Sequence, residues 1–132
     1  MRGSGVAGGM ATTTLTTENH DETVKDGTVL IDFWAGWCVP CQRFAPIFDK
    51  ASEAHPEVTF AKVDTEDQQL LAQRYGVTSI PTLVAYRDGI PVFSQPGALR
   101  EADLEDLISQ IGKLDMDEVR AAYEKAKEQQ QG

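Results

Sequence analysis

Basic residues and long apolar runs are scarce in this chain of 132 residues. Twelve lysines and arginines stand against 21 acidic residues, so the net charge is −9 at pH 7. Such a charge repels phosphate backbones and anionic lipid headgroups, which argues against nucleic-acid and membrane-surface binding. No apolar segment approaches the ~20 residues that span a bilayer, and no basic-then-apolar leader opens the chain. These absences predict a soluble, cytoplasmic, monomeric protein of one domain.

Cysteine and histidine are also rare, with two residues of each kind. Both cysteines, Cys38 and Cys41, belong to one Cys-x-x-Cys segment, whereas His20 and His55 are far from each other in the sequence. A structural zinc site needs about four protein ligands, and these histidines have no metal-like spacing. We therefore expect no metal site.

The composition divides the chain into three segments. Residues 1–10 read MRGSGVAGGM and are predicted to be an expression leader or a flexible N-terminus without function. Residues 11–113 are predicted to form the domain, and residues 114–132 a helical extension. In the extension, Asp115 and Glu118 resemble a capping box. Its apolar residues at helical spacing are Met116, Val119, Tyr123 and Ala126.

Strand-like and helix-like patterns alternate within the domain, which is typical of an α/β fold. The clearest strand is Thr28–Trp34, whose nearly continuous apolar run predicts a central strand covered on both faces. Asp88 and Gly89 between two apolar runs predict an antiparallel hairpin. The predicted strands are residues 12–16, 28–34, 58–63, 82–86 and 90–94, and the predicted helices are residues 18–25, 40–51, 70–75 and 104–111. We expect a central mixed sheet of about five strands with helices on both faces.

The two cysteines follow the central strand directly, at the start of a predicted helix that Pro40 opens. Two intervening residues place the sulfurs within bonding distance across one helical turn. The helix N-terminus stabilises negative charge on Cys38, and a thiolate is the nucleophile of disulfide exchange. Cys41 lies one turn further in and is expected to stay protonated until it attacks a mixed disulfide. The pattern therefore indicates a redox pair.

A structural disulfide is the alternative for this pair. Closing so small a loop stabilises a domain little, because the entropy of loop closure grows with loop length. Such a bridge also needs an oxidising compartment. A Cys-x-x-Cys segment between a strand and a helix, in a chain that opens with no basic-then-apolar secretory leader, favours the redox interpretation.

Asp32 is the one charged residue in the central strand, six positions before Cys38. Its side chain is predicted to point inward beneath the cysteines, where a low dielectric raises the pKa of a carboxyl group. Such a group suits the removal of the proton from Cys41, directly or through water. The alternative is an aspartate that only accepts a hydrogen bond from a backbone donor.

Four segments, VLIDFWAGWCVPC, KVDTEDQ, YGVTSIPTL and DGIPVFSQPGAL, resemble in order and spacing the motifs of the thioredoxin family. The resemblance runs from about Thr12 to Lys113, and WCVPC is a variant of the family's WCGPC motif. It implies the thioredoxin fold and a thiol–disulfide oxidoreductase that reduces protein disulfides through a Cys38/Cys41 cycle with a mixed-disulfide intermediate. It also implies thioredoxin reductase as electron donor, disulfide-containing proteins as targets, and a redox-active disulfide in place of any bound cofactor.

By position, the resemblance implies Cys38 as the attacking thiol, Cys41 as the resolving thiol and Asp32 as the proton-transfer group. It implies a cis peptide bond before Pro81, where the base rate alone favours trans. Lys62 matches the family's buried lysine and is a charge partner for Asp32, although its alternating strand also fits an exposed lysine. The implied target-binding rim consists of Trp37, Val39, Pro40, Ile80, Thr82, Gly97 and Ala98.

Several residues depart from the family pattern. Val39 stands where thioredoxins usually have glycine, Pro96 stands where a small or β-branched residue is common, and Gln42-Arg43 replaces the usual basic-plus-methionine pair. These departures bear on redox potential and on the choice of partner. His20 stands where many relatives carry an aromatic core residue, so we expect a partly buried structural histidine.

Two other functions stay open beside that of a general reductant. The same fold can serve as a binding subunit in which redox turnover is incidental. A more oxidising pair, caused by Val39, would suit an oxidase or isomerase. The two thiols and Asp32 together favour the reductant.

Overall fold

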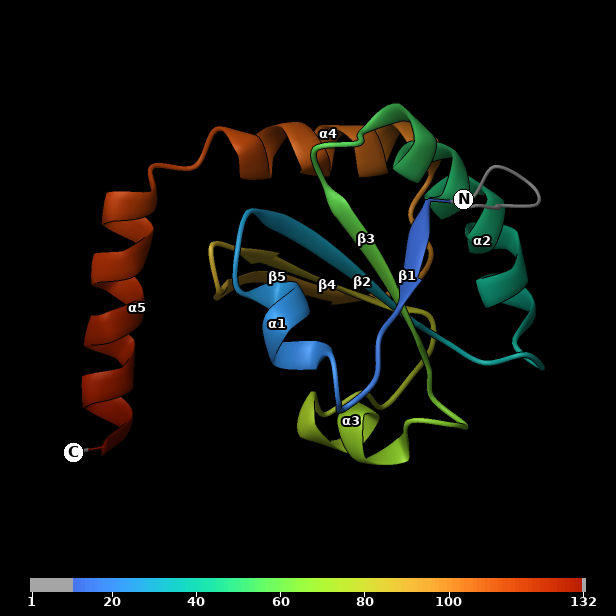
Figure 1. Cartoon of the computed structure of the whole chain (residues 1–132), viewed down its shortest axis with the longest axis horizontal. Coiled ribbons are helices and arrows are strands. Elements are labelled where there is room, and N and C mark those ends of the chain that lie inside the picture. The colour runs from blue at the N-terminus through green and yellow to red at the C-terminus, as the bar shows by residue number, and fades with distance from the viewer. Residues whose placement is uncertain (1–10, 132) are drawn as a thin grey trace.

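The computed structural model describes residues 11–131, so the predicted leader at 1–10 lies outside the described residues. Within that range the chain forms five strands and five helices, which alternate as far as β4 (Figure 1). The strands are β1 (Thr12–Thr14), β2 (Thr28–Trp34), β3 (Thr59–Asp64), β4 (Thr82–Arg87) and β5 (Ile90–Pro96). The helices are α1 (His20–Val24), α2 (Val39–Ala54), α3 (Gln69–Arg74), α4 (Glu101–Gly112) and α5 (Met116–Gln131). The α/β class and the predicted elements are confirmed, with shifts of a few residues at their ends.

The sheet has the strand order β1-β3-β2-β4-β5, so β2 is the central strand. β2 pairs in parallel with β3 and antiparallel with β4. β4 and β5 form the predicted antiparallel hairpin, whose turn holds Asp88 and Gly89 at positive φ. The sheet is therefore mixed, and the segments that leave β2 and enter β4 meet at one end of it.

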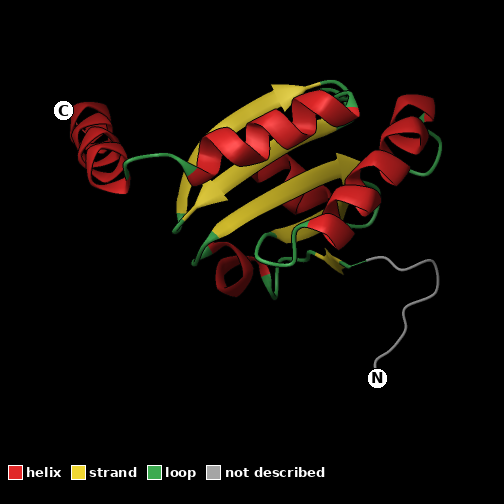
Figure 2. Cartoon of the chain, turned by 90° about the horizontal axis from the view of Figure 1, so that it is seen from above, coloured by secondary structure: helices red, strands yellow, loops and turns green. Residues whose placement is uncertain are grey.

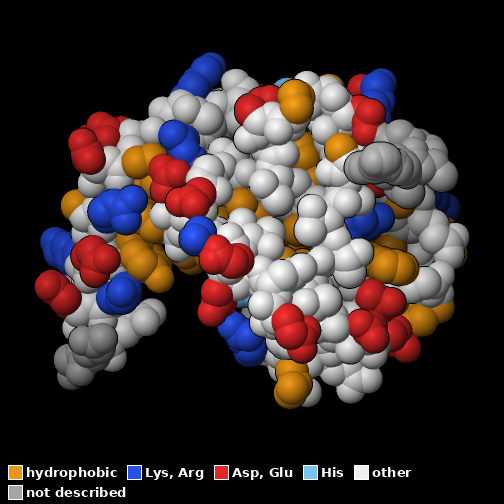
Figure 3. All heavy atoms as spheres, viewed as in Figure 1, with side chains coloured by type: hydrophobic (Ala, Val, Ile, Leu, Met, Phe, Trp, Pro, Cys, Tyr) orange, Lys and Arg blue, Asp and Glu red, His pale blue; other side chains and the backbone are white. Residues whose placement is uncertain are grey.

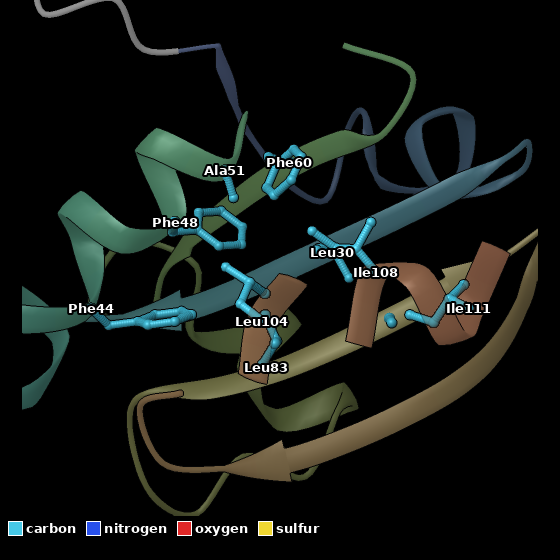
Figure 4. Close-up of a cluster of buried hydrophobic side chains, with 10 residues drawn as sticks. Leu30, Phe44, Phe48, Ala51, Phe60, Leu83, Leu104, Ile108 and Ile111 are labelled. Atoms are coloured by element: carbon cyan, nitrogen blue, oxygen red, sulfur yellow. The ribbon is translucent and has the colours of Figure 1, made fainter. Parts of the chain in front are cut away.

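Two apolar cores cover the two faces of the sheet, which explains the continuous apolar pattern of β2. On one face, α2 and α4 pack on Leu30, Phe60 and Leu83 (Figure 4). On the other face, Val29, Ile31 and Phe33 of β2 belong to a separate core that includes residues of α1 and α3. Figure 2 shows helices on both sides of the twisted sheet. Because strand side chains alternate, Asp32 projects to the same face as Leu30, beneath α2.

Helix α1 begins at His20, two residues later than predicted. The delay has a local cause, because the side-chain oxygen of Asn19 accepts a hydrogen bond from the backbone N–H of Thr16 at 2.8 Å. This bond holds Thr16 to Asn19 in a turn before the helix starts.

The predicted C-terminal helix is present as α5 and stands beside the domain rather than over the sheet (Figure 1). The carboxylate of Asp115 accepts hydrogen bonds from the backbone N–H groups of Asp117 and Glu118, as an N-cap does. An open groove of about 360 Å³ separates α5 from β5, and Val119, Ala122 and Tyr123 line its helical side. Hydrophobic side chains lie on the side of this helix that faces the domain in Figure 3. Within residues 11–131, no helix is long and apolar enough to span a membrane.

Candidate active site

The cysteine pair lies where the central strand β2 passes into helix α2. Cys38 has an extended backbone conformation and is the N-cap residue of α2, and Pro40 lies in its first turn. The Cys38 Sγ accepts a hydrogen bond from the backbone N–H of Cys41 at 3.2 Å. The first turn of the helix thus directs a donor at the outer sulfur, which stabilises negative charge there.

Cys38 and Cys41 form a disulfide bond, with their Cα atoms 5.2 Å apart. Only 4% of Cys38 and 3% of Cys41 is exposed to solvent. They are packed with Ala35, Trp34 and Ile80 in a small apolar cluster of their own. Both sulfurs are therefore almost completely shielded from solvent.

The second part of the site comes from the segment that enters β4. The Ile80–Pro81 peptide bond is cis, as the family resemblance implies. The carbonyl oxygen of Ile80 lies 3.8 Å from the Cys38 Sγ, and the Pro81 carbonyl accepts a hydrogen bond from the Gly97 N–H at 2.8 Å. Residues far apart in the sequence are therefore brought against the same sulfur.

Asp32 is 1% exposed, and neither of its carboxylate oxygens has a hydrogen-bond partner among the described residues. The predicted inward orientation is thus found, and the alternative of a carboxylate held by a backbone donor is not. Burial without compensating donors raises the pKa of Asp32 from 3.8 to about 7. The pKa of this carboxyl therefore lies near neutrality, where it can accept or release a proton.

Two charged side chains act on Asp32 from neighbouring elements. Lys62 of β3 is the cross-strand partner of Asp32, and its positive charge works against the rise in pKa. Lys62 is partly buried, and its Nζ lies 5.5 Å from the centre of the Trp34 ring. Asp49 of α2 raises the pKa of Asp32 further by charge repulsion. Asp49 could not be singled out from the sequence, because a carboxylate on a partly exposed helix position interrupts no pattern.

Most residues of the implied target-binding rim surround Cys38 at the surface. Trp37 is 68% exposed and Val39 is 52% exposed, so both are among the exposed large hydrophobic side chains of the described residues. Thr82 differs, because it is 7% exposed and its hydroxyl donates to the Ser79 carbonyl at 2.7 Å. Its side chain is not free to contact a partner. Pro40, Gly97 and Ala98 are exposed, and Ile80 is partly buried.

A pocket of about 340 Å³ adjoins this rim and was not predicted from the sequence. Trp37 and Ile80 line it together with Thr65, Ala72, Val77, Thr78 and Ser79. The Trp37 indole N–H donates to the Glu66 carboxylate at 3.3 Å, which holds the ring at the pocket's edge. These residues come from separate loops and helices, so no local pattern could have grouped them.

His20 lies on the opposite face of the sheet from the cysteines and is 6% exposed. Its Nδ1 is 2.8 Å from the Asp21 carboxylate, and its Nε2 is hydrogen-bonded to the Tyr75 hydroxyl, which in turn contacts the Tyr86 hydroxyl at 2.7 Å. Both ring nitrogens of His20 have hydrogen-bond partners within the fold, as expected for a structural histidine. Across residues 11–131 there is no group of three His, Cys, Asp or Glu side chains that could hold a metal ion.

Comparisons with known proteins agree with this geometry. The family model described as thioredoxin matches residues 11–110. The chain is 58% identical over 113 residues to the protein named "Putative thioredoxin 2" from Streptomyces coelicolor, covering 85% of this chain and 84% of that protein. It is 39% identical over 104 residues to thioredoxin from Alicyclobacillus acidocaldarius, covering 74% of this chain and 99% of the relative.

Among solved structures, a mutant thioredoxin from Halobacterium salinarum superposes with a TM-score of 0.74 at 34% identity, covering 83% of this chain and 98% of the other. The Malassezia sympodialis thioredoxin superposes with a TM-score of 0.67 at 33% identity, over 76% of this chain and 90% of that one. The family membership implies a reductase and target proteins as partners in general terms. The chain belongs to the thioredoxin family, and Cys38 and Cys41 are the redox-active disulfide of a thioredoxin-type thiol–disulfide oxidoreductase with protein-disulfide reductase activity.

Proposed function

We propose that Cys38 is the thiol that attacks target disulfides and that Cys41 is the thiol that resolves the intermediate. The proposal rests above all on the hydrogen bond from the Cys41 N–H to the Cys38 Sγ at the start of α2. In the reduced protein, the same donor and the helix dipole stabilise a thiolate on Cys38. No such donor is directed at the inner sulfur of Cys41 among the described residues.

In the first step, the Cys38 thiolate attacks one sulfur of a target disulfide. A bond forms between the Cys38 sulfur and that target sulfur, and the disulfide of the target breaks. The other target sulfur leaves as a thiolate and takes a proton from solvent. The product is a mixed disulfide between Cys38 and the target.

In the second step, Cys41 attacks the Cys38 sulfur of the mixed disulfide. Asp32 takes the proton from Cys41, directly or through water, because the pKa of this buried carboxyl is raised to about 7. The Cys38–Cys41 disulfide forms, and the second target sulfur leaves and is protonated. The target has then gained two electrons and this protein has lost two.

The target binds at the exposed rim around Cys38. Trp37 and Val39 supply apolar contact area, and the backbone beside Pro81 offers an extended segment for pairing with the target chain. Gly97 permits close approach, with Pro40 and Ala98 beside it. The side chain of Thr82 is engaged with Ser79, so its contribution is limited to its backbone.

Trapping of the mixed disulfide tests the order of attack. Cys41→Ser should accumulate a covalent adduct with an oxidised target such as insulin, because the resolving thiol is gone. Cys38→Ser is the matched control and should accumulate far less. Equal trapping by both variants would contradict the assignment of the two roles.

We also propose that thioredoxin reductase is the electron donor. The protein is further proposed to act as a monomer in a reducing compartment, the cytoplasm. A dithiol that must be returned to its reduced form supports the donor and the compartment. Coupled oxidation of NADPH by a thioredoxin reductase and this protein, with insulin as acceptor, tests the donor. An equilibrium with glutathione that leaves Cys38 and Cys41 oxidised would contradict the role of a general reductant and favour an oxidase.

A further inference from the structure

A second cavity reaches the cysteine pair, and none of the rim residues lines it. It measures about 190 Å³, and Cys41, Trp34, Ala45 and Lys62 are among its lining residues. Cys41 is 3% exposed, and it is one of the residues that line this cavity. The outer sulfur of Cys38 does not line it. The two cysteines thus face different surroundings, the rim on one side and this cavity on the other.

The mouth of the cavity includes its two most exposed lining residues. Of all the residues that line it, only Gly36 and Gln42 are exposed. The side-chain amide of Gln42 donates a hydrogen bond to the Gly36 carbonyl oxygen at 2.9 Å. This bond joins the first turn of α2 to the turn that precedes Cys38, and it ties the two sides of the mouth together.

We infer that Gln42 gates a water-sized approach to Cys41, so that water reaches this thiol while larger thiols and disulfides do not. Gln42 is a positioning residue here, because it acts through the Gly36 carbonyl and touches no reacting atom. The inference rests on the proposed role of Cys41 as resolving thiol, since that role needs a sulfur that reacts within the molecule and with nothing else.

The size of the cavity supports a gate for small molecules only. A volume of about 190 Å³ has room for a few waters, each of which occupies ~30 Å³ in the liquid. Pockets that bind drug-sized molecules measure about 300–1,000 Å³. A peptide thiol therefore cannot reach Cys41 by this route while the Gln42–Gly36 bond holds, whereas water can carry protons to and from it.

The charges around the cavity fit this use. Lys62 is the charged side chain that lines it, and Lys62 is also the cross-strand partner of Asp32. A charged wall favours water over apolar molecules in so small a space. Arg43, the neighbour of Gln42 on α2, is exposed and does not line the cavity, so it offers a matched control.

Labelling of the inner thiol tests the gate. In a Cys38→Ser background, the single thiol is Cys41, and its rate of alkylation by iodoacetamide is measured under native conditions. Gln42→Ala should raise this rate about fivefold, the factor that corresponds to loss of a hydrogen bond worth ~1 kcal/mol. Gln42→Met keeps the length of the side chain but has no donor, and it should raise the rate as well.

Arg43→Ala should leave the labelling rate unchanged, and urea unfolding of each variant checks that faster labelling does not come from global unfolding. Rates for Gln42→Ala and Gln42→Met that equal the parent's would overturn the gate, as would an equal increase in Arg43→Ala. The labelling rate does not depend on which cysteine attacks targets. Failure of the gate therefore leaves the trapping result intact, and failure of the trapping experiment leaves the labelling result intact.

Discussion

Replacing Asp32 by asparagine should change how the stability of the oxidised protein depends on pH. In the folded state, burial raises the pKa of Asp32 from 3.8 to about 7. Below the unfolded pKa both states hold the proton, so the carboxyl makes the free energy of unfolding no more dependent on pH. As the pH rises toward the folded pKa, the unfolded chain releases a proton that the folded protein keeps, so stability falls. At 1.36 kcal/mol per pKa unit, the total loss is about 4 kcal/mol once the pH exceeds about 7.

The measurement is urea unfolding of the oxidised wild type and of Asp32→Asn between about pH 5 and about pH 9. The disulfide keeps Cys38 and Cys41 from titrating. Other titrating groups are common to both proteins, so they cancel in the difference. About 3 kcal/mol of the loss falls within this range, and the variant should gain that much over the wild type as the pH rises. The unpartnered amide of the variant has a cost of its own, but that cost does not vary with pH.

A difference between the two proteins that stays flat from about pH 5 to about pH 9 would refute the reasoning, because the carboxyl of Asp32 would then titrate alike in both states.

Three further results are expected from the contacts described above. Lys62→Met should raise the pKa of Asp32 further, as NMR titration of the carboxyl would show, because the positive charge that opposes the shift is lost; an unchanged or lower pKa would contradict the charge pairing. Glu105→Gln should lower the pKa of His55, because the hydrogen bond to Glu105 at 2.7 Å is the main cause of its raised pKa. The stability that this contact contributes is present at low pH and is lost as the pH rises through the pKa of His55 in the folded state. NMR titration of the His55 ring checks this prediction, and an unchanged pKa in the variant would contradict it. Phe48→Ala should cost about 3–5 kcal/mol in urea unfolding, since Phe48 is fully buried, and a loss below about 1 kcal/mol would show that the core collapses around the gap.

The architecture could be predicted from the sequence where burial determines which residues of an element are apolar. Thr28–Trp34 is covered on both faces, so nearly every residue in it is apolar, and the predicted strand matches β2 from end to end. The start of α1 could not be predicted as well, because the side chain of Asn19 competes with the helix for the backbone of Thr16. Local hydrogen bonds of this kind leave little trace in an apolar periodicity.

The site could be predicted where one residue breaks a strong pattern. Asp32 is visible because it is a charge within an apolar strand. Asp49 acts on Asp32 from a partly exposed position of the amphipathic helix α2, where a carboxylate breaks no pattern, so nothing distinguished it. The hydrogen bond between Gln42 and Gly36 and the pocket beside Trp37 depend on how separate segments meet, which only the fold decides.

The order of the strands has a practical consequence for engineering this molecule. One segment of the redox site leaves β2 and the other enters β4, and these two strands pair in the register Phe33 to Thr82 inside the sheet. The two outermost strands, β1 and β5, carry neither cysteine nor the cis proline. Fusions and grafted peptides are therefore best placed beside β1, since β5 leads into Gly97, whose N–H donates to the Pro81 carbonyl. A slip of one residue between β2 and β4 would separate the cis proline from the sulfurs and abolish activity.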